Sequence, residues 1–119
     1  MDTTSKVRLN TLQTGLQTAV VRKVILQDGN FNGTPCQLLK IRLEVGEETI
    51  SNYIPIDDKY AKKLAFIGHA MGMDGEFAVE DLLAVQDVPV VVKLVEHHSL
   101  PGKMIAVEWF RAVEDEPNG

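Results

Sequence analysis

The order of its secondary-structure signals constrains the fold of this chain most strongly. The clearest signal is the segment 37–45, QLLKIRLEV, in which aliphatic residues from Leu39 to Val45 alternate with Lys40, Arg42 and Glu44. A period of two places the aliphatic side chains on one face of a strand and the charges on the other. This segment is therefore predicted to be a strand with one buried and one exposed face.

Further strand signals lie on both sides of one helix. The β-branched segment 16–26, LQTAVVRKVIL, predicts a strand, and its unalternating doublets indicate a bulge. A turn over 28–33 joins it to the next strand. The other predicted strands are 49–56, 88–95 and 104–113. A helix beginning at Asp57-Asp58 and ending at Gly72 or Gly75 precedes a short helical turn over 80–84.

The order β-β-β-α-β-β is that of the OB-fold, a small barrel that binds oligonucleotides. The predicted fold is mainly β with one helix: a five-stranded, OB-fold-like Greek-key barrel with its helix between strands three and four. We divide the chain into a flexible N-terminal lead-in (1–15), an OB-fold domain (16–113) and an acidic C-terminal tail (114–119).

Composition argues against several classes of protein. No apolar run approaches the roughly 20 residues of a membrane span, and the N-terminus shows no signal peptide, so a cytoplasmic protein without membrane contact is expected. The single cysteine, Cys36, cannot form an intrachain disulfide and is interpreted as a small strand residue. The net charge of −5 argues against binding nucleic acid through bulk charge alone.

No pattern of catalytic or metal-binding residues is apparent. His97 and His98 are adjacent on a predicted strand, so their rings should face opposite sides and cannot chelate one metal together. Asp57 and Asp58 are explained by helix capping, and no glycine spacing matches a phosphate-binding loop. We therefore predict no enzyme activity, no metal and no cofactor.

Aromatic and basic residues suggest a binding face instead. In an OB-fold the ligand lies across strands two and three, where Lys40, Arg42 and Tyr53 fall, and Phe31 lies on a flanking loop. Stacking of Phe31 and Tyr53 on bases is weighed evenly against structural packing. Trp109 should face inward and Phe110 outward. The candidate nucleic-acid-binding residues are Phe31, Lys40, Arg42, Tyr53, Lys93 and Phe110.

Several short motifs resemble those of a bacteriophage family of OB-fold single-stranded DNA-binding proteins. They are the hairpin VILQDGNFNG (24–33) followed by a charged alternating strand, the helix KKLAFIGHAMGM (62–73) and the Asp81-Leu82-Leu83 segment. The likeness spans about residues 20 to 113. It implies a protein of the host-cell cytoplasm that coats single-stranded DNA without sequence specificity during replication or recombination.

The resemblance and the residues leave the partners and one rival function open. The resemblance implies an acidic tail that recruits replication or recombination proteins or guards the DNA site. This tail ends Pro117-Asn118-Gly119 without a terminal aromatic residue, which argues against recruitment through the tail. An open strand edge is compatible with a homodimer. The rival hypothesis is an OB-fold adaptor or inhibitor that binds a basic protein and no nucleic acid. The net charge and the few exposed rings favour this rival.

Overall fold

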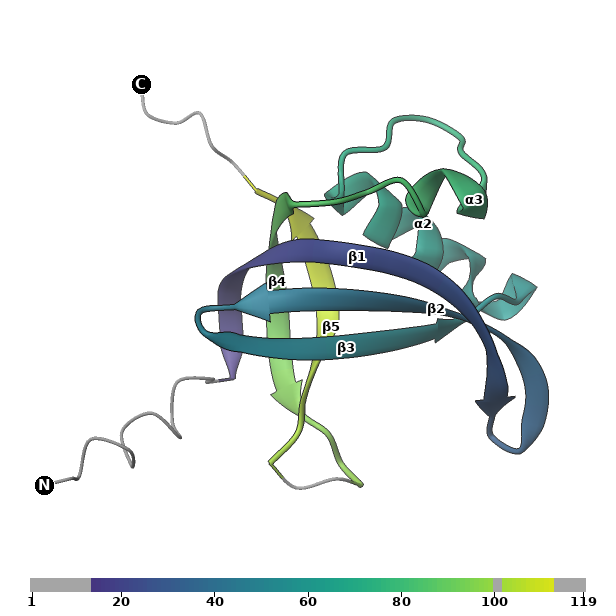
Figure 1. The fold of residues 1–119 in the computed structure, drawn as a ribbon, viewed down its shortest axis with the longest axis horizontal. Helices are drawn as coiled ribbons and strands as arrows, with labels where there is room; N and C mark the ends of the chain where they lie inside the picture. Colours follow the sequence, from purple (N-terminus) through teal and green to yellow (C-terminus); the bar gives the residue numbers. More distant parts are fainter. Residues whose placement is uncertain (1–13, 100–101, 113–119) are drawn as a thin grey trace, which may run out of the picture.

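The computed structural model describes residues 14–99 and 102–112, which form five strands and a helical segment (Figure 1). The predicted lead-in, except for its last two residues, and the predicted tail lie outside these residues. The elements are β1 (Gly15–Phe31), β2 (Thr34–Val45), β3 (Glu48–Pro55), the 3-10 turn η1 (Asp58–Tyr60), α2 (Ala61–Ala70), α3 (Val79–Leu82), β4 (Val88–Glu96) and β5 (Met104–Arg111). The element order is therefore the predicted one.

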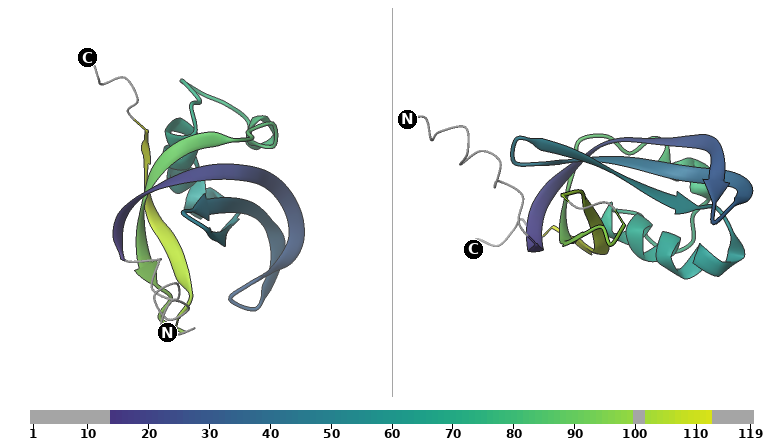
Figure 2. Two further views of the ribbon diagram at one scale, coloured as in Figure 1. Left: turned by 60° about the vertical axis from the view of Figure 1, so that its left-hand side comes forward. Right: turned by 90° about the horizontal axis from the view of Figure 1, so that it is seen from below.

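All five strands form one antiparallel sheet in the order β3-β2-β1-β4-β5. β1 is the central strand and joins the β2–β3 side of the sheet to the β4–β5 side. Its residues 20–31 pair with β2, and its residues 15–21 pair with β4. The register shifts between Val21 and Lys23, which confirms the predicted bulge. A bulge increases strand twist and bending, and β1 curves strongly as it passes from β4 to β2 (Figure 2).

The turn between β1 and β2 is shorter than the sequence suggests. β1 continues to Phe31, which pairs with Thr34, so only Asn32 and Gly33 form the turn. Both have positive φ, 54° and 81°. An Asn-Gly pair tolerates two such residues in succession, and two-residue turns of this kind match the twist of a hairpin. The predicted turn over 28–33 therefore contains the true turn at its C-terminal end but also includes four residues of strand.

The alternation of β2 is confirmed by its burial. Leu39, Ile41 and Leu43 are fully buried, whereas Arg42 is exposed and Lys40 half-buried. In β5 Trp109 is 8 % exposed and Phe110 45 % exposed, as predicted, although strict alternation is interrupted: the buried residues Ala106 and Trp109 are three apart, where the register with β4 shifts. The sheet and α2 share one core, to which α2 contributes its buried face.

The boundaries of the helical segment follow from local chemistry. The Asp57 carboxylate accepts a hydrogen bond from the Lys59 N–H (3.1 Å) and caps η1, which leads into α2. Gly72 has a φ of 107°, so the chain leaves the helix there. Within α2, Gly68 allows a close approach, because a Cβ at this position would overlap the ring of Phe77. α3 spans residues 79–82, whereas the short helical turn was predicted over 80–84.

A buried amide joins the two edge strands of the sheet. Asn52 of β3 is 7 % exposed and lies on the apolar face with Ile50 and Ile54. Its Nδ2 donates to the Ala106 carbonyl (2.8 Å), and its Oδ1 accepts from the Ala106 N–H (3.0 Å). Ala106 lies on β5, so one side chain satisfies a backbone donor and a backbone acceptor across the space between β3 and β5.

Candidate nucleic-acid interface

A basic and aromatic cluster lies on the outer face of β1, β2 and β3. Register places Lys23 of β1 opposite Arg42 of β2, and Lys40 of β2 opposite Tyr53 of β3. These positions alternate with the buried residues of the same strands, so their side chains leave the sheet on its solvent side. We call Lys23, Lys40, Arg42 and Tyr53 the β1–β3 patch.

The members of the β1–β3 patch are close enough to act together. The Lys40 ammonium lies 5.7 Å from the centroid of the Tyr53 ring, a cation–π distance. Tyr53 is nonetheless 41 % exposed, so much of its ring faces solvent. Lys23, Lys40 and Arg42 line a shallow cleft with Ile25. No residue in the described part of the chain forms an ion pair with any of these three cations.

Arg22, beside the patch, has its charge neutralised. Its guanidinium contacts the Glu44 carboxylate (2.7 Å) and the Asp87 carboxylate (2.7 Å). The hydrogen bonds to Glu44 and then to Asp87 raise the pKa of Arg22 above its ordinary value. The bulge that follows Val21 leaves Arg22 and Lys23 both exposed, between the buried Val21 and Val24.

A groove extends the patch beyond β3. It runs between the outer face of β3, with Ser51 and Tyr53, and the loop before β5, with Gly102, Lys103 and Met104. Lys103 is exposed and brings a further cation toward Tyr53. Sequence reasoning placed a ligand between this loop and strand three but did not name Lys103. Its position in the loop between the last two strands is the signal that could have identified it.

The other candidate residues lie apart from the β1–β3 patch. Phe31, at the end of the β1–β2 hairpin, packs edge-on against Tyr60 with ring centroids 5.6 Å apart. Lys93 lies on β4 and approaches Glu108 of β5 at 3.9 Å. Phe110 is exposed on β5 and lines a groove with α2. The structure thus brings together three of the six, Lys40, Arg42 and Tyr53.

The two adjacent histidines are arranged differently from the prediction. The rings of His97 and His98 stack with centroids 5.0 Å apart and an angle of 9° between planes. The prediction that they face opposite sides is wrong, because β4 ends at Glu96 and strand alternation no longer applies. The His97 Nδ1 accepts the Ser99 N–H (3.0 Å). Within the described residues, no three His, Cys, Asp or Glu side chains are grouped to hold a metal ion.

Comparisons with known proteins leave the site to be interpreted from its own chemistry. No protein-family model matches the sequence, and a search of curated proteins finds no match. None of the helices in residues 14–99 and 102–112 has the length and apolarity required to cross a membrane. The β1–β3 patch offers three cations that have no ion-pair partner within residues 14–99 and 102–112, and one exposed ring. This arrangement can attract phosphates and stack against a planar group.

Proposed function

We propose that this chain is a single-stranded DNA-binding protein with an OB-type barrel, of the kind that bacteriophages encode, and that it binds without sequence specificity. The observation that carries the proposal is the β1–β3 patch. Proteins that bind single strands in this way combine a cationic groove with rings on which bases stack. Lys23, Lys40 and Arg42 supply charge, and Tyr53 supplies the ring.

The sheet supports the OB-type assignment. A five-stranded sheet in the order β3-β2-β1-β4-β5, with the helix between β3 and β4, has the connectivity of that fold. The Asn52 hydrogen bonds to Ala106 bring β3 and β5, the two edges, into contact. In an OB-fold the outer face of strands two and three and the loops beside it bind the ligand. The β1–β3 patch lies on the outer face of β1, β2 and β3, and Lys103 lies on the loop before β5, which supports the proposal.

The proposed mechanism divides the work between phosphates and bases. Lys23, Lys40 and Arg42 contact successive phosphates, and each contact releases condensed counterions. One base stacks on the exposed part of the Tyr53 ring, while Lys103 holds the strand from the loop side. Tyr53 and Lys40 are cross-strand partners, so one nucleotide can meet both a ring and a cation. No side chain forms a hydrogen bond with a base edge in this arrangement, so binding should show no sequence preference.

The rival function, an adaptor or inhibitor that binds a basic protein, is favoured by the acidic composition. The chain carries a net charge of −5, and Tyr53 is the only ring in the patch. Oligo-dT titration followed by fluorescence anisotropy at low and moderate salt separates the two functions. We expect saturable binding that weakens as salt rises. Absence of binding below about 100 μM at low salt would favour the rival, because non-specific binding is normally tighter than that.

The aromatic contact is tested by Tyr53→Ala. We expect affinity for oligo-dT to fall by about 1–3 kcal/mol, the usual value of a base–aromatic stack, with little change in the thermal midpoint. Tyr53→Phe is the matched control and should retain most of the affinity, since it keeps the ring. If Tyr53→Ala lowers stability and leaves affinity intact, the ring is structural and DNA does not bind at the patch.

The phosphate contacts are tested by comparing two arginines. Arg42→Ala should weaken binding and lower the salt slope, log K against log salt, by about one unit. Arg22→Ala is the matched control, because Arg22 is already paired with Glu44 and Asp87 and should change the slope little. Equal losses in the two variants would indicate a diffuse charge effect, not a patch centred on Lys40 and Arg42.

A further inference from the structure

Exposed apolar side chains gather along a groove between α2 and β5. Six large hydrophobic side chains are exposed among the described residues, and Phe66, Val107 and Phe110 all line this groove. Phe66 is 64 % exposed and Phe110 45 % exposed. Single exposed hydrophobic residues are common on monomers, but a contiguous group of this kind marks an interaction surface. We call it the α2–β5 groove.

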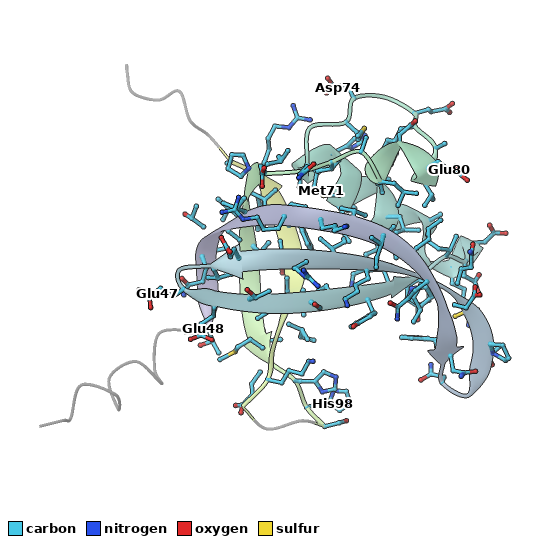
Figure 3. The ribbon with its side chains drawn as sticks, in the orientation of Figure 1. Glu47, Glu48, Met71, Asp74, Glu80 and His98 are labelled. Atoms are coloured by element: carbon cyan, nitrogen blue, oxygen red, sulfur yellow. The ribbon has the colours of Figure 1, made fainter. Side chains whose placement is uncertain are left out.

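The α2–β5 groove has an apolar centre and charged ends. Phe66 and Phe110 line both of its halves, above Trp109. Lys62 and Lys63 lie at one end, where they outnumber the single carboxylate of Glu108. The other end carries Asp74, whose side chain is 86 % exposed and stands clear of the loop after α2 (Figure 3).

The two ends of the groove differ in whether their charged side chains form ion pairs within the described residues. Arg111 approaches Asp74 at 3.3 Å, while its Nε donates to the His69 carbonyl at 3.0 Å. Arg111 thereby joins the end of β5 to the end of α2, and Asp74 keeps most of its surface in solvent. Lys62 and Lys63 have no ion-pair partner among the residues that the structure describes.

This distribution is self-complementary. We propose that a second copy of the chain docks in the α2–β5 groove by two-fold symmetry. In a two-fold interface the same patch meets itself in opposite directions. The Phe66 and Phe110 rings of one copy then lie on those of the other, and Lys62 and Lys63 face the partner's Asp74. Lys62 and Lys63 outnumber Glu108 at one end, and Asp74 is more exposed than Arg111 at the other, so a uniformly basic or uniformly acidic occupant would meet like charge at one of the two ends.

The dimer leaves the β1–β3 patch uncovered. α2 and the β1–β2–β3 layer lie on opposite sides of the molecule when it is viewed from below (Figure 2, right). Two copies joined through α2 and β5 therefore present their patches to solvent on separate surfaces. The dimer does not depend on the proposed DNA binding, and its test uses no nucleic acid for the primary readout.

The first test is sedimentation equilibrium of the full chain without DNA, over a range of protein concentrations. We expect a reversible monomer–dimer equilibrium that Phe66→Glu shifts toward monomer by at least tenfold in the dissociation constant. Leu16→Glu is the matched control, because Leu16 is also 64 % exposed but lies on β1, outside the groove. Leu16→Glu should leave the dissociation constant unchanged. Circular dichroism should show that both variants remain folded.

The second test uses charge reversal to identify the two-fold arrangement. Lys63→Glu alone and Asp74→Lys alone should each weaken the dimer by a few-fold, as expected for exposed ion pairs. The double variant Lys63→Glu/Asp74→Lys should restore it, because each new carboxylate then faces a new ammonium. If the double variant loses as much dimerisation free energy as the two single variants together, this pairing is excluded.

Three results would overturn the proposal. The first is a chain that remains monomeric up to about 0.5 mM, where even weak specific dimers form. The second is a dimer unaffected by Phe66→Glu, which would locate the interface elsewhere, for example at the β3 edge. The third is a loss of oligo-dT affinity in Phe66→Glu with no change in mass, which would make the groove part of a DNA path instead.

Discussion

At the scale of single residues, Asn52 has the most specific structural role. It is the one buried polar or charged side chain in the described core, and both polar atoms of its amide, Nδ2 and Oδ1, form hydrogen bonds with the Ala106 backbone. Periodicity predicts that Asn52 faces the core with Ile50 and Ile54. It does not predict the partner, because Ala106 is 54 residues away. A polar residue can lie on this apolar face because the Ala106 backbone, across the space between β3 and β5, satisfies both of its hydrogen-bonding atoms.

Replacing Asn52 should therefore destabilise the fold. Asn52→Leu leaves the Ala106 N–H and C=O unpaired, and we expect the free energy of unfolding in urea to fall by about 2 kcal/mol or more. Ser51→Ala is the neighbouring control, on the opposite face, and should change it by about 0.5 kcal/mol or less. Equal stability of Asn52→Leu and the parent chain would show that the amide bridge contributes nothing.

The same position allows a test that depends on pH. In Asn52→Asp, burial and the nearby Ala106 carbonyl favour the protonated carboxyl, so its folded-state pKa should rise above the unfolded value. A group with a raised pKa stabilises the fold at low pH and loses this contribution as pH rises through the folded pKa. The stability deficit of Asn52→Asp relative to the parent should therefore shrink as pH is lowered toward the ordinary carboxyl range. A deficit independent of pH would contradict burial of the carboxyl.

At the scale of elements, β2 shows the clearest agreement between pattern and structure. Its strict alternation makes Ile41 fully buried and Arg42 exposed. Ile41→Asp should unfold the domain, because it buries an unpaired charge. Arg42→Asp, the adjacent control on the solvent face, should remain folded. Trp109 is the single tryptophan and is buried, so its fluorescence can follow unfolding. A soluble, cooperative Ile41→Asp variant would mean that the two faces of β2 are reversed.

Element boundaries were harder to predict than element types. Phe31 was placed at a turn, yet it ends β1, because Asn32 and Gly33 alone complete the reversal. The stacking of His97 on His98 was missed because the two histidines were treated as strand residues, whereas β4 ends at Glu96, directly before them. In both places a run of residues with similar propensity leaves the end of the strand undetermined. Hydrogen bonding with the neighbouring strand determines it.

At the scale of the whole molecule, charge must be judged by location. The chain is acidic, with a net charge of −5, and three carboxylates lie in the segment from Glu114 to Glu116. Glu47 and Glu48 project at the β2–β3 turn (Figure 3). The cations of the β1–β3 patch, by contrast, lie on adjacent strands. A net negative charge is therefore compatible with a local basic surface, whose range in solution is limited by screening.

The C-terminal segment provides a whole-molecule prediction. As a tethered polyanion, residues 114–119 should compete with phosphates for the β1–β3 patch. Deleting them should leave stability unchanged and tighten oligo-dT binding modestly at low salt, and the gain should vanish at physiological salt, where the Debye length is about 8 Å. Glu114→Gln/Asp115→Asn/Glu116→Gln, which keeps the length, should reproduce the gain. Equal affinities at low salt would show that the segment does not compete.

The sequence by itself determined the types and order of the elements and the faces of the strands. Local periodicity is clearest in β2, where it places Ile41 inside and Arg42 outside. Only the tertiary structure decided which residues meet. It joined Asn52 to Ala106, neutralised Arg22 with Glu44 and Asp87, and separated Phe110 from the β1–β3 patch. Such contacts join residues far apart in the chain, and a local pattern carries no information about them.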